Sequence, residues 1–116
     1  RRLRFPPLVY ADFSGRGGSN LSFPKPDLVA PGVNITAPTP GGAYTTVTGT
    51  SFSTPFVTGS AALLMEWGII QRNDPFLWGE KVKAYLRRGA QPLPGFNEYP
   101  NEAVGWGKLC VAESII

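Results

Sequence analysis

The stretch Gly49-Thr50-Ser51-Phe52-Ser53-Thr54-Pro55-Phe56-Val57-Thr58-Gly59-Ser60 places one serine, Ser51, between a Gly/Thr-rich turn and a long apolar helix. The N–H groups in the first turn of a helix are unpaired and lie at the positive end of the helix dipole, where an oxyanion would be stabilised. Ser51 is therefore a candidate nucleophile. A serine at this place is also an ordinary N-cap, whose hydroxyl satisfies the same N–H groups, and this stretch alone leaves both interpretations open.

Length and composition predict one small globular domain. The chain has 116 residues, and 42% of them are hydrophobic, which is enough for a packed core. Its 14 Gly and 12 Pro have no repeating period, so they are typical of turns and not of collagen or a low-complexity linker. The single cysteine, Cys110, excludes an internal disulfide, and no residues have metal-ligand spacing. We expect no metal or other cofactor in this segment.

The charge pattern and the hydropathy argue against two kinds of partner. The net charge is +3, and much of it lies at Arg1, Arg2 and Arg4 and at Arg87-Arg88, whereas a nucleic-acid surface interleaves basic and aromatic residues on one face. No apolar run approaches the ~20 residues that span a bilayer. We therefore expect neither a nucleic-acid partner nor a membrane partner.

The chain contains no histidine. Most acid–base and nucleophilic chemistry near neutral pH uses an imidazole, so we do not expect these residues alone to form a complete active site. The chain also begins without Met, which suggests either a processed product or a part of a longer protein.

The first half of the sequence predicts strands and turns. Residues 8–14 are β-branched and aromatic enough for a short strand that ends in a Gly-rich turn. Pro24 and Pro26 force an extended path into residues 27–32. The segments 33–37 and 43–47 alternate with a period near two, which predicts a β-hairpin with a five-residue connection.

The second half predicts helices. Residues 51–67 are apolar on nearly the whole circumference, as in a helix buried inside a larger domain, and Gly68 should end this helix. Asp74-Pro75 should begin an amphipathic helix that ends near Gly89 and covers the first one. The apolar face of that second helix would carry Trp78, Val82, Tyr85 and Leu86. A tight turn at 105–107 should open a short final helix.

Four motifs, in this order, resemble the C-terminal part of the subtilisin-like serine protease (subtilase) domain. They are Phe13-Ser14-Gly15-Arg16-Gly17 (F-S-x-x-G), the P-D-x-x-A-P-G motif within residues 25–32, Gly49-Thr50-Ser51 with Pro55, Val57 and Gly59, and Gly105-Trp106-Gly107-Lys108-Leu109. The resemblance implies an α/β fold with three layers, of which residues 1–116 are the C-terminal portion of one peptidase domain. In this portion, short strands and a β-hairpin precede a buried helix and an amphipathic helix.

The resemblance also implies roles for residues around Ser51. In the family, the residue at Ser51 attacks the scissile carbonyl, and its own N–H is half of the oxyanion hole. Thr50 would line that hole, Phe52 would lie beside the nucleophile, and Thr48 with Val47 would border the leaving-group side of the cleft. The family's catalytic Asp and His and its oxyanion Asn lie earlier than this segment, so we expect the chain alone to be inactive.

One departure from the family pattern implies a different core contact and no loss of chemistry, whereas the resemblance of the second half to one branch leaves the function open. Phe56 replaces the usual, non-catalytic His after the proline. The second half looks closest to the clostridial branch that includes spore-germination proteases, some of which have lost triad residues and act as sensors or regulators. The resemblance thus implies an endopeptidase with a Ser–His–Asp triad, or alternatively an inactive pseudoprotease.

The family suggests a peptide or protein substrate and a bacterial protein that is secreted or associated with the cell or spore. It leaves open whether the whole protein binds calcium. A small independent interaction domain is a weaker alternative, because a helix that is apolar all round needs a sheet beside it. An uncovered face of that helix, together with open strand edges, predicts that this chain by itself associates into homo-oligomers.

Overall fold

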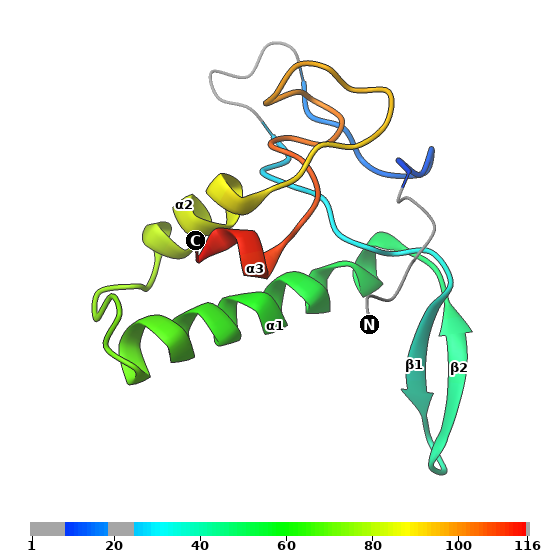
Figure 1. Ribbon diagram of the computed structural model, residues 1–116. Coiled ribbons are helices and arrows are strands. Elements are labelled where there is room, and N and C mark those ends of the chain that lie inside the picture. The colour runs from blue at the N-terminus through cyan, green and yellow to red at the C-terminus, as the bar shows by residue number, and fades with distance from the viewer. Residues whose placement is uncertain (1–8, 19–24, 116) are drawn as a thin grey trace, which may run out of the picture.

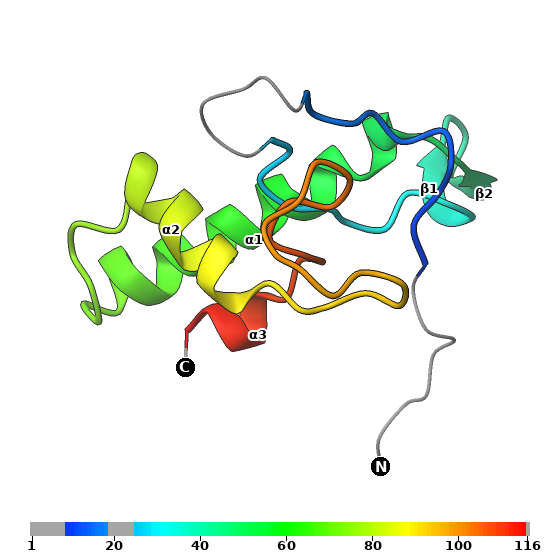
Figure 2. The same ribbon diagram turned by 90° about the horizontal axis from the view of Figure 1, so that it is seen from above.

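The computed structural model describes residues 9–18 and 25–115. Helix α1 (Thr54–Met65) runs along one side of the molecule, and α2 (Glu80–Gly89) and α3 (Val111–Ser114) pack beside it (Figure 1). Strands β1 (Ile35–Thr39) and β2 (Ala43–Val47) form an antiparallel hairpin that projects from the start of α1. The hairpin and the loop before α2 lie at opposite ends of α1 (Figure 2).

The core has two parts. Leu64 of α1, Leu77 of the loop before α2, and Leu86 of α2 pack together in the first part. Val82 and Tyr85 of α2 are half-buried against this cluster, so the prediction of an amphipathic helix that covers the first one is confirmed. The second part consists of Leu93, Ala103 and Val104 in the long loop that follows α2.

The extended segment before β1 joins the closing glycine turn through backbone hydrogen bonds. Val29 N donates to Gly107 O at 2.9 Å, and Leu109 N donates to Val29 O at 2.7 Å. Gly105 has φ 58°, and a Cβ at this position would strike the carbonyl oxygens of Pro26 and Asp27. Only glycine fits there, so two of the predicted motifs are complementary parts of one junction.

The predicted strand at residues 8–14 is wrong for the part that the structure describes, which begins at residue 9. Residues 11–14 form a turn instead, in which Ser14 N donates to Ala11 O at 3.1 Å. Tyr10 Oη donates to Ser14 O at 3.1 Å and closes the same turn. Among the described residues, no neighbouring strand pairs with this segment, and β-branched residues without a partner strand do not form a ladder.

The predicted hairpin is confirmed, but its connection has three residues, Pro40-Gly41-Gly42, and not five. Strand β1 continues through Pro38, which pairs with Tyr44 in the register of the hairpin. A proline fits a two-stranded ribbon because its missing N–H can face the open edge. Gly41 and Gly42 have φ of 91° and 81°, which allows the shorter turn.

Both predicted helix boundaries near Gly68 and Asp74 are wrong. The helix continues past Gly68 as a π-helical turn, η2 (Glu66–Ile70). Asp74 instead opens a separate turn, in which Leu77 N donates to Asp74 O at 3.1 Å. Gly79, with φ 61°, separates that turn from α2, so Trp78 is 62% exposed and does not lie on the buried face.

The prediction of a buried helix holds for one face of α1 only. Ser60 and Leu64 are its buried residues, and both belong to the side covered by the rest of the chain. Phe56, Leu63 and Met65 are exposed on the described molecule. Among the described residues, no helix is long and apolar enough to cross a membrane.

The serine turn as a candidate active site

Ser51 lies in the middle of a single 3-10 turn, η1 (Thr50–Phe52), which leads directly into α1. The expectation that Ser51 begins or caps the long helix is therefore corrected, because Ser53 occupies the N-cap of α1. Phe52 N donates to Gly49 O at 3.1 Å and Ser53 N donates to Thr50 O at 3.0 Å. Within the described part of the chain this pattern leaves the amide of Ser51 without a partner, and the Ser51 residue is exposed.

The turn rests on the end of the extended segment that precedes β1. Gly49 N donates to Gly32 O at 2.7 Å, and a Cβ at Gly32 would lie 2.9 Å from Gly49 O and still closer to Ser53 Oγ. Gly49 itself has φ 150°, a conformation that L residues rarely adopt. Sequence reasoning missed this support: Pro31-Gly32 indicates a turn, but nothing in it shows that Gly49 is the partner.

The other predicted site residues all lie within this turn or at its entrance. Val47 ends β2, and the Thr48 Oγ1 that follows it accepts a hydrogen bond from Asn34 N at 3.0 Å. Thr50 is exposed, and Phe52 is half-buried with its ring near Gly49. The structure thus brings the predicted residues together around Ser51, while their catalytic roles stay predictions.

Two cavities lie under the turn, where Thr50 and Ser53 line both of them. The larger, of ≈ 350 Å³, is lined by Leu28 and Val57 among others. The smaller, of ≈ 120 Å³, extends toward Tyr10 and Leu93. Ser51 lines neither cavity, so the two cavities are separate from the exposed face of the turn that carries Ser51.

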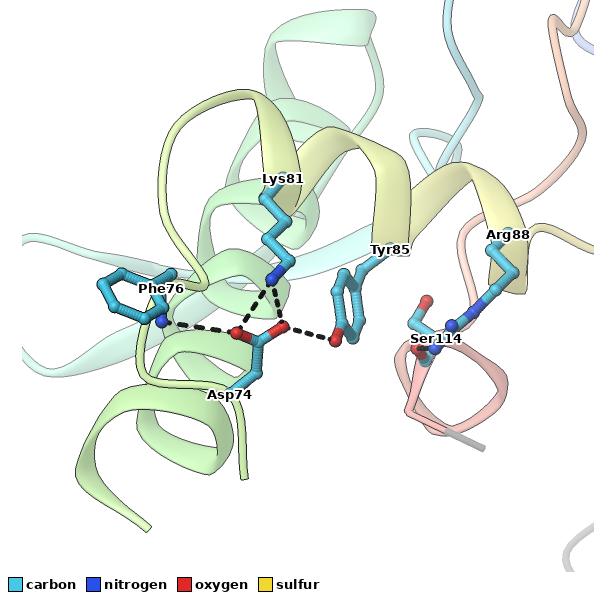
Figure 3. Close-up of polar contacts among 6 residues, drawn as sticks. All are labelled: Asp74, Phe76, Lys81, Tyr85, Arg88 and Ser114. Carbon is cyan, nitrogen blue, oxygen red and sulfur yellow. Dashed lines mark hydrogen bonds and ion pairs between the residues drawn. The ribbon is translucent and has the colours of Figure 1, made fainter. Parts of the chain in front are cut away.

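A second polar cluster, which the sequence did not reveal, lies at the far end of α1 (Figure 3). Asp74 Oδ1 accepts hydrogen bonds from Lys81 Nζ at 2.9 Å and from Phe76 N at 3.3 Å. Asp74 Oδ2 accepts one from Tyr85 Oη at 2.6 Å and forms an ion pair with Lys81 Nζ at 2.7 Å. The Lys81 ammonium, followed by the Tyr85 hydroxyl, lowers the pKa of Asp74 from 3.8. The cluster ties the loop before α2 to the first turns of α2, so its role is structural.

Arg88 extends this network to the C-terminal helix. Its Nη2 donates to Ser114 O at 2.7 Å, and its guanidinium lies 4.7 Å from the centre of the Tyr85 ring (Figure 3).

Within residues 9–18 and 25–115, no group of three or more His, Cys, Asp or Glu side chains lies close enough together to bind a metal ion.

Comparison with known proteins shows the family to which the chain belongs. The chain is a member of the subtilase family, whose profile matches residues 9–107. It is 46% identical over 98 residues to the PII-type proteinase of Lactococcus lactis subsp. cremoris, in an alignment that covers 75% of this chain and 5% of that protein. Over 73 residues it is 36% identical to subtilisin BL of Lederbergia lenta, covering 63% of this chain and 25% of that protein.

A solved structure shows the same arrangement of elements. The CspB protease of Clostridium perfringens superposes with a TM-score of 0.85 and 45% sequence identity, over 91% of this chain and 23% of that one. The predicted subtilisin-like α/β fold is therefore confirmed, and this neighbour agrees with the predicted clostridial resemblance. The chain spans only a small part of each of these relatives.

Proposed function

We propose that residues 1–116 are the C-terminal portion of one subtilisin-like peptidase domain and supply its nucleophile, Ser51. The observation that carries the proposal is the exposed Ser51, one turn before α1 in a chain of the subtilase family, with an amide that has no partner among the described residues. The substrate would be a peptide or protein. The rest of the triad, a His and an Asp, would come from outside these residues.

In this mechanism Ser51 Oγ attacks the scissile carbonyl while the histidine takes its proton and passes it to the leaving amine. The Ser51 N–H donates to the developing oxyanion, and the nearby N-terminal end of α1 adds its dipole. An acyl-enzyme forms, and water then releases it. Thr50 and Phe52 flank the nucleophile, and Thr48 borders the path of the leaving group.

Labelling of the whole protein with a fluorophosphonate tests the proposal. The reagent should modify Ser51, as read by mass spectrometry of the labelled peptide, and Ser51→Ala should abolish labelling and peptide hydrolysis together. Ser53→Ala is the matched control, since this serine lies two residues away and lines the inner cavities. A folded protein that is not labelled at Ser51 would instead support the sensor or regulator alternative.

The same proposal makes the 116-residue chain inactive when it is alone, because it contains no histidine. Turnover of a fluorogenic peptide by this chain, lost in Ser51→Ala, would contradict that part.

We further propose that the whole protein is secreted or associated with the cell or spore of a bacterium, as its bacterial relatives suggest. Exposed apolar residues on α1 support self-association of the chain alone.

A further inference from the structure

We infer that Thr54 is a positioning residue for the proposed reaction, because its hydroxyl helps to fix the direction of the Ser51 N–H. Thr54 is the first residue of α1, and the proposed catalytic steps do not use its side chain. The inference rests on the proposed function of Ser51. It adds to that function how the chain holds the proposed oxyanion donor in place.

The Ser51 N–H belongs to the same peptide group as the Thr50 carbonyl. A peptide group is planar and trans, so its N–H and its C=O lie in one plane and point in opposite directions. Among the described residues the Ser51 N–H has no hydrogen-bond partner, whereas the Thr50 oxygen accepts hydrogen bonds. The donors that hold the Thr50 oxygen therefore set the direction of the Ser51 N–H.

Two donors within the described chain hold the Thr50 oxygen. Ser53 N donates to it at 3.0 Å and closes the 3-10 turn η1. Thr54 Oγ1 donates to it at 3.4 Å. A threonine hydroxyl in a helix can reach back to the carbonyl four residues earlier, and here that carbonyl lies in the serine turn. The Thr54 side chain thus ties the start of α1 to the peptide group that carries the proposed oxyanion donor.

A peptide group held in this way should act on the chemical step and not on substrate binding. An oxyanion donor is effective when it is aligned in advance with the place where negative charge develops. Hydrogen bonds to the carbonyl also polarise the peptide group, which makes its N–H a stronger donor. The oxyanion exists only in the transition state and the intermediate, so loss of the Thr54 hydroxyl should lower kcat and leave KM nearly unchanged.

The next turn of α1 contains a matched bond that orients no donor. Thr58 Oγ1 donates to Thr54 O at 3.2 Å, and both threonines are exposed on the described molecule. The Thr54 carbonyl shares its peptide group with the nitrogen of Pro55, which carries no hydrogen. The Thr58 hydroxyl therefore makes the same kind of bond as the Thr54 hydroxyl but has no N–H to position.

The test compares Thr54→Val with Thr58→Val in the whole protease, on a peptide substrate with a chromogenic amide. Valine keeps the branched shape of threonine and removes only the hydroxyl. We expect Thr54→Val to lower kcat by about 2- to 10-fold, the effect of one hydrogen bond, with KM nearly unchanged. Thr58→Val should change neither constant. Thr54→Ser, which restores the hydroxyl, should recover most of the loss.

A peptide aldehyde gives a second readout, which depends on the oxyanion and not on turnover. Ser51 Oγ adds to the aldehyde carbon, its proton passes to the histidine, and the carbonyl oxygen becomes an oxyanion beside the Ser51 N–H. Thr54→Val should weaken inhibition by the aldehyde by the same factor as it lowers kcat. The corresponding peptide alcohol has no carbonyl to attack, so its inhibition constant should not change.

The outcomes separate this inference from the proposed function. Equal changes in Thr54→Val and Thr58→Val, or a loss in Thr54→Val that appears in KM alone with unchanged aldehyde inhibition, would overturn the inference and leave the proposed function intact. The two variants should have similar urea midpoints, because each loses one exposed hydrogen bond of the same kind. No hydrolysis by the unaltered protein, with no labelling of Ser51, would overturn the proposed function and this inference with it.

Discussion

Gly68 lies against Leu77 so closely that a Cβ at Gly68 would come within 2.7 Å of Leu77 Cδ2 and 2.9 Å of Asp74 O. This contact holds the π-helical turn after α1 against the loop that precedes α2. It also explains why a residue expected to end a helix is found within one.

Gly68→Ala should therefore destabilise the chain. The added methyl group meets backbone as well as a buried side chain, and overpacking of this kind costs about 1–3 kcal/mol. Gly59→Ala is the control, since Gly59 lies inside α1 and a Cβ there would meet nothing within 4 Å, and glycine inside a helix costs about 0.5–1 kcal/mol relative to alanine. The urea midpoint should move in opposite directions for the two variants, and a stabilising Gly68→Ala would contradict the contact.

Leu77→Ala should be among the most destabilising changes in the loop before α2. Leu77 is completely buried with Leu64 and Leu86, and loss of such a side chain costs about 2–5 kcal/mol. Its neighbour Phe76 is 72% exposed, so Phe76→Ala should change the free energy of unfolding by less than about 0.5 kcal/mol. Thermal unfolding of both variants checks this pair, and similar losses in the two would show that the loop is packed differently.

The free energy of unfolding should fall in acid, because protonation of Asp74 breaks its ion pair with Lys81. The folded chain keeps Asp74 ionised to lower pH than the unfolded chain, because Lys81 and Tyr85 lower its pKa from 3.8. Its stabilising effect is therefore complete above about pH 4 to 5 and is lost as the pH falls through the lower folded value. The Asp74 hydrogen bond raises the pKa of Lys81 from 10.5 and that of Tyr85 from 10.0, so the same stabilisation should also be lost as the pH rises above about 10.

Asp74→Asn tests this dependence. The variant should have a lower urea midpoint than the unaltered chain. By the same linkage, this difference should be largest and nearly constant between about pH 5 and 9, and it should shrink at lower and at higher pH. Glu80→Gln is the control, because Glu80 forms an exposed ion pair with Lys83 at 3.8 Å, and such pairs contribute little. A difference for Asp74→Asn that persists unchanged at about pH 2 would argue against the lowered pKa.

The chain alone should associate through the uncovered side of α1. Phe56 and Leu63 of α1 are 41% and 56% exposed, and Ile70 of η2 is 74% exposed; exposed apolar surface of this kind favours association. Leu63→Lys should shift the chain toward monomer in light scattering, whereas Thr58→Lys, at an exposed polar position of α1, should not. An unaltered chain that is monomeric at high concentration would contradict the expectation.

The sequence predicted the elements that carry strong local signals. The alternation in residues 33–47 and the amphipathic pattern of α2 were sufficient for the hairpin and the covering helix, and the family motifs were sufficient for the fold. Local signals failed where a distant contact decides the structure. Gly68 is typical of a helix end, but Leu77 explains why glycine is needed there. Asp74 is typical of a cap, but its side chain binds Lys81 and Tyr85, seven and eleven residues away.

The candidate site shows the same limit. The motif placed Ser51 at the entrance to α1, and the structure agrees to within one turn. The contact between Gly32 and Gly49 could not be predicted, because neither segment contains a sequence feature that shows which residue it contacts. The cluster around Asp74 was likewise missed: residues 74, 81 and 85 have helical spacing, but Asp74 lies in a separate turn before α2, and the fold of that turn brings its carboxylate to Lys81 and Tyr85.

The segment from Asp27 to Gly32 touches a glycine turn at each of its ends. At one end the carbonyl of Asp27 lies against Gly105, and at the other Gly32 lies against the serine turn at Gly49. This short stretch therefore acts as a spacer of fixed length between two turns that are distant in the sequence. Insertion or deletion of one residue within it would move Ser51 relative to the closing turn, whereas the hairpin tip at 40–42 is free to vary in length.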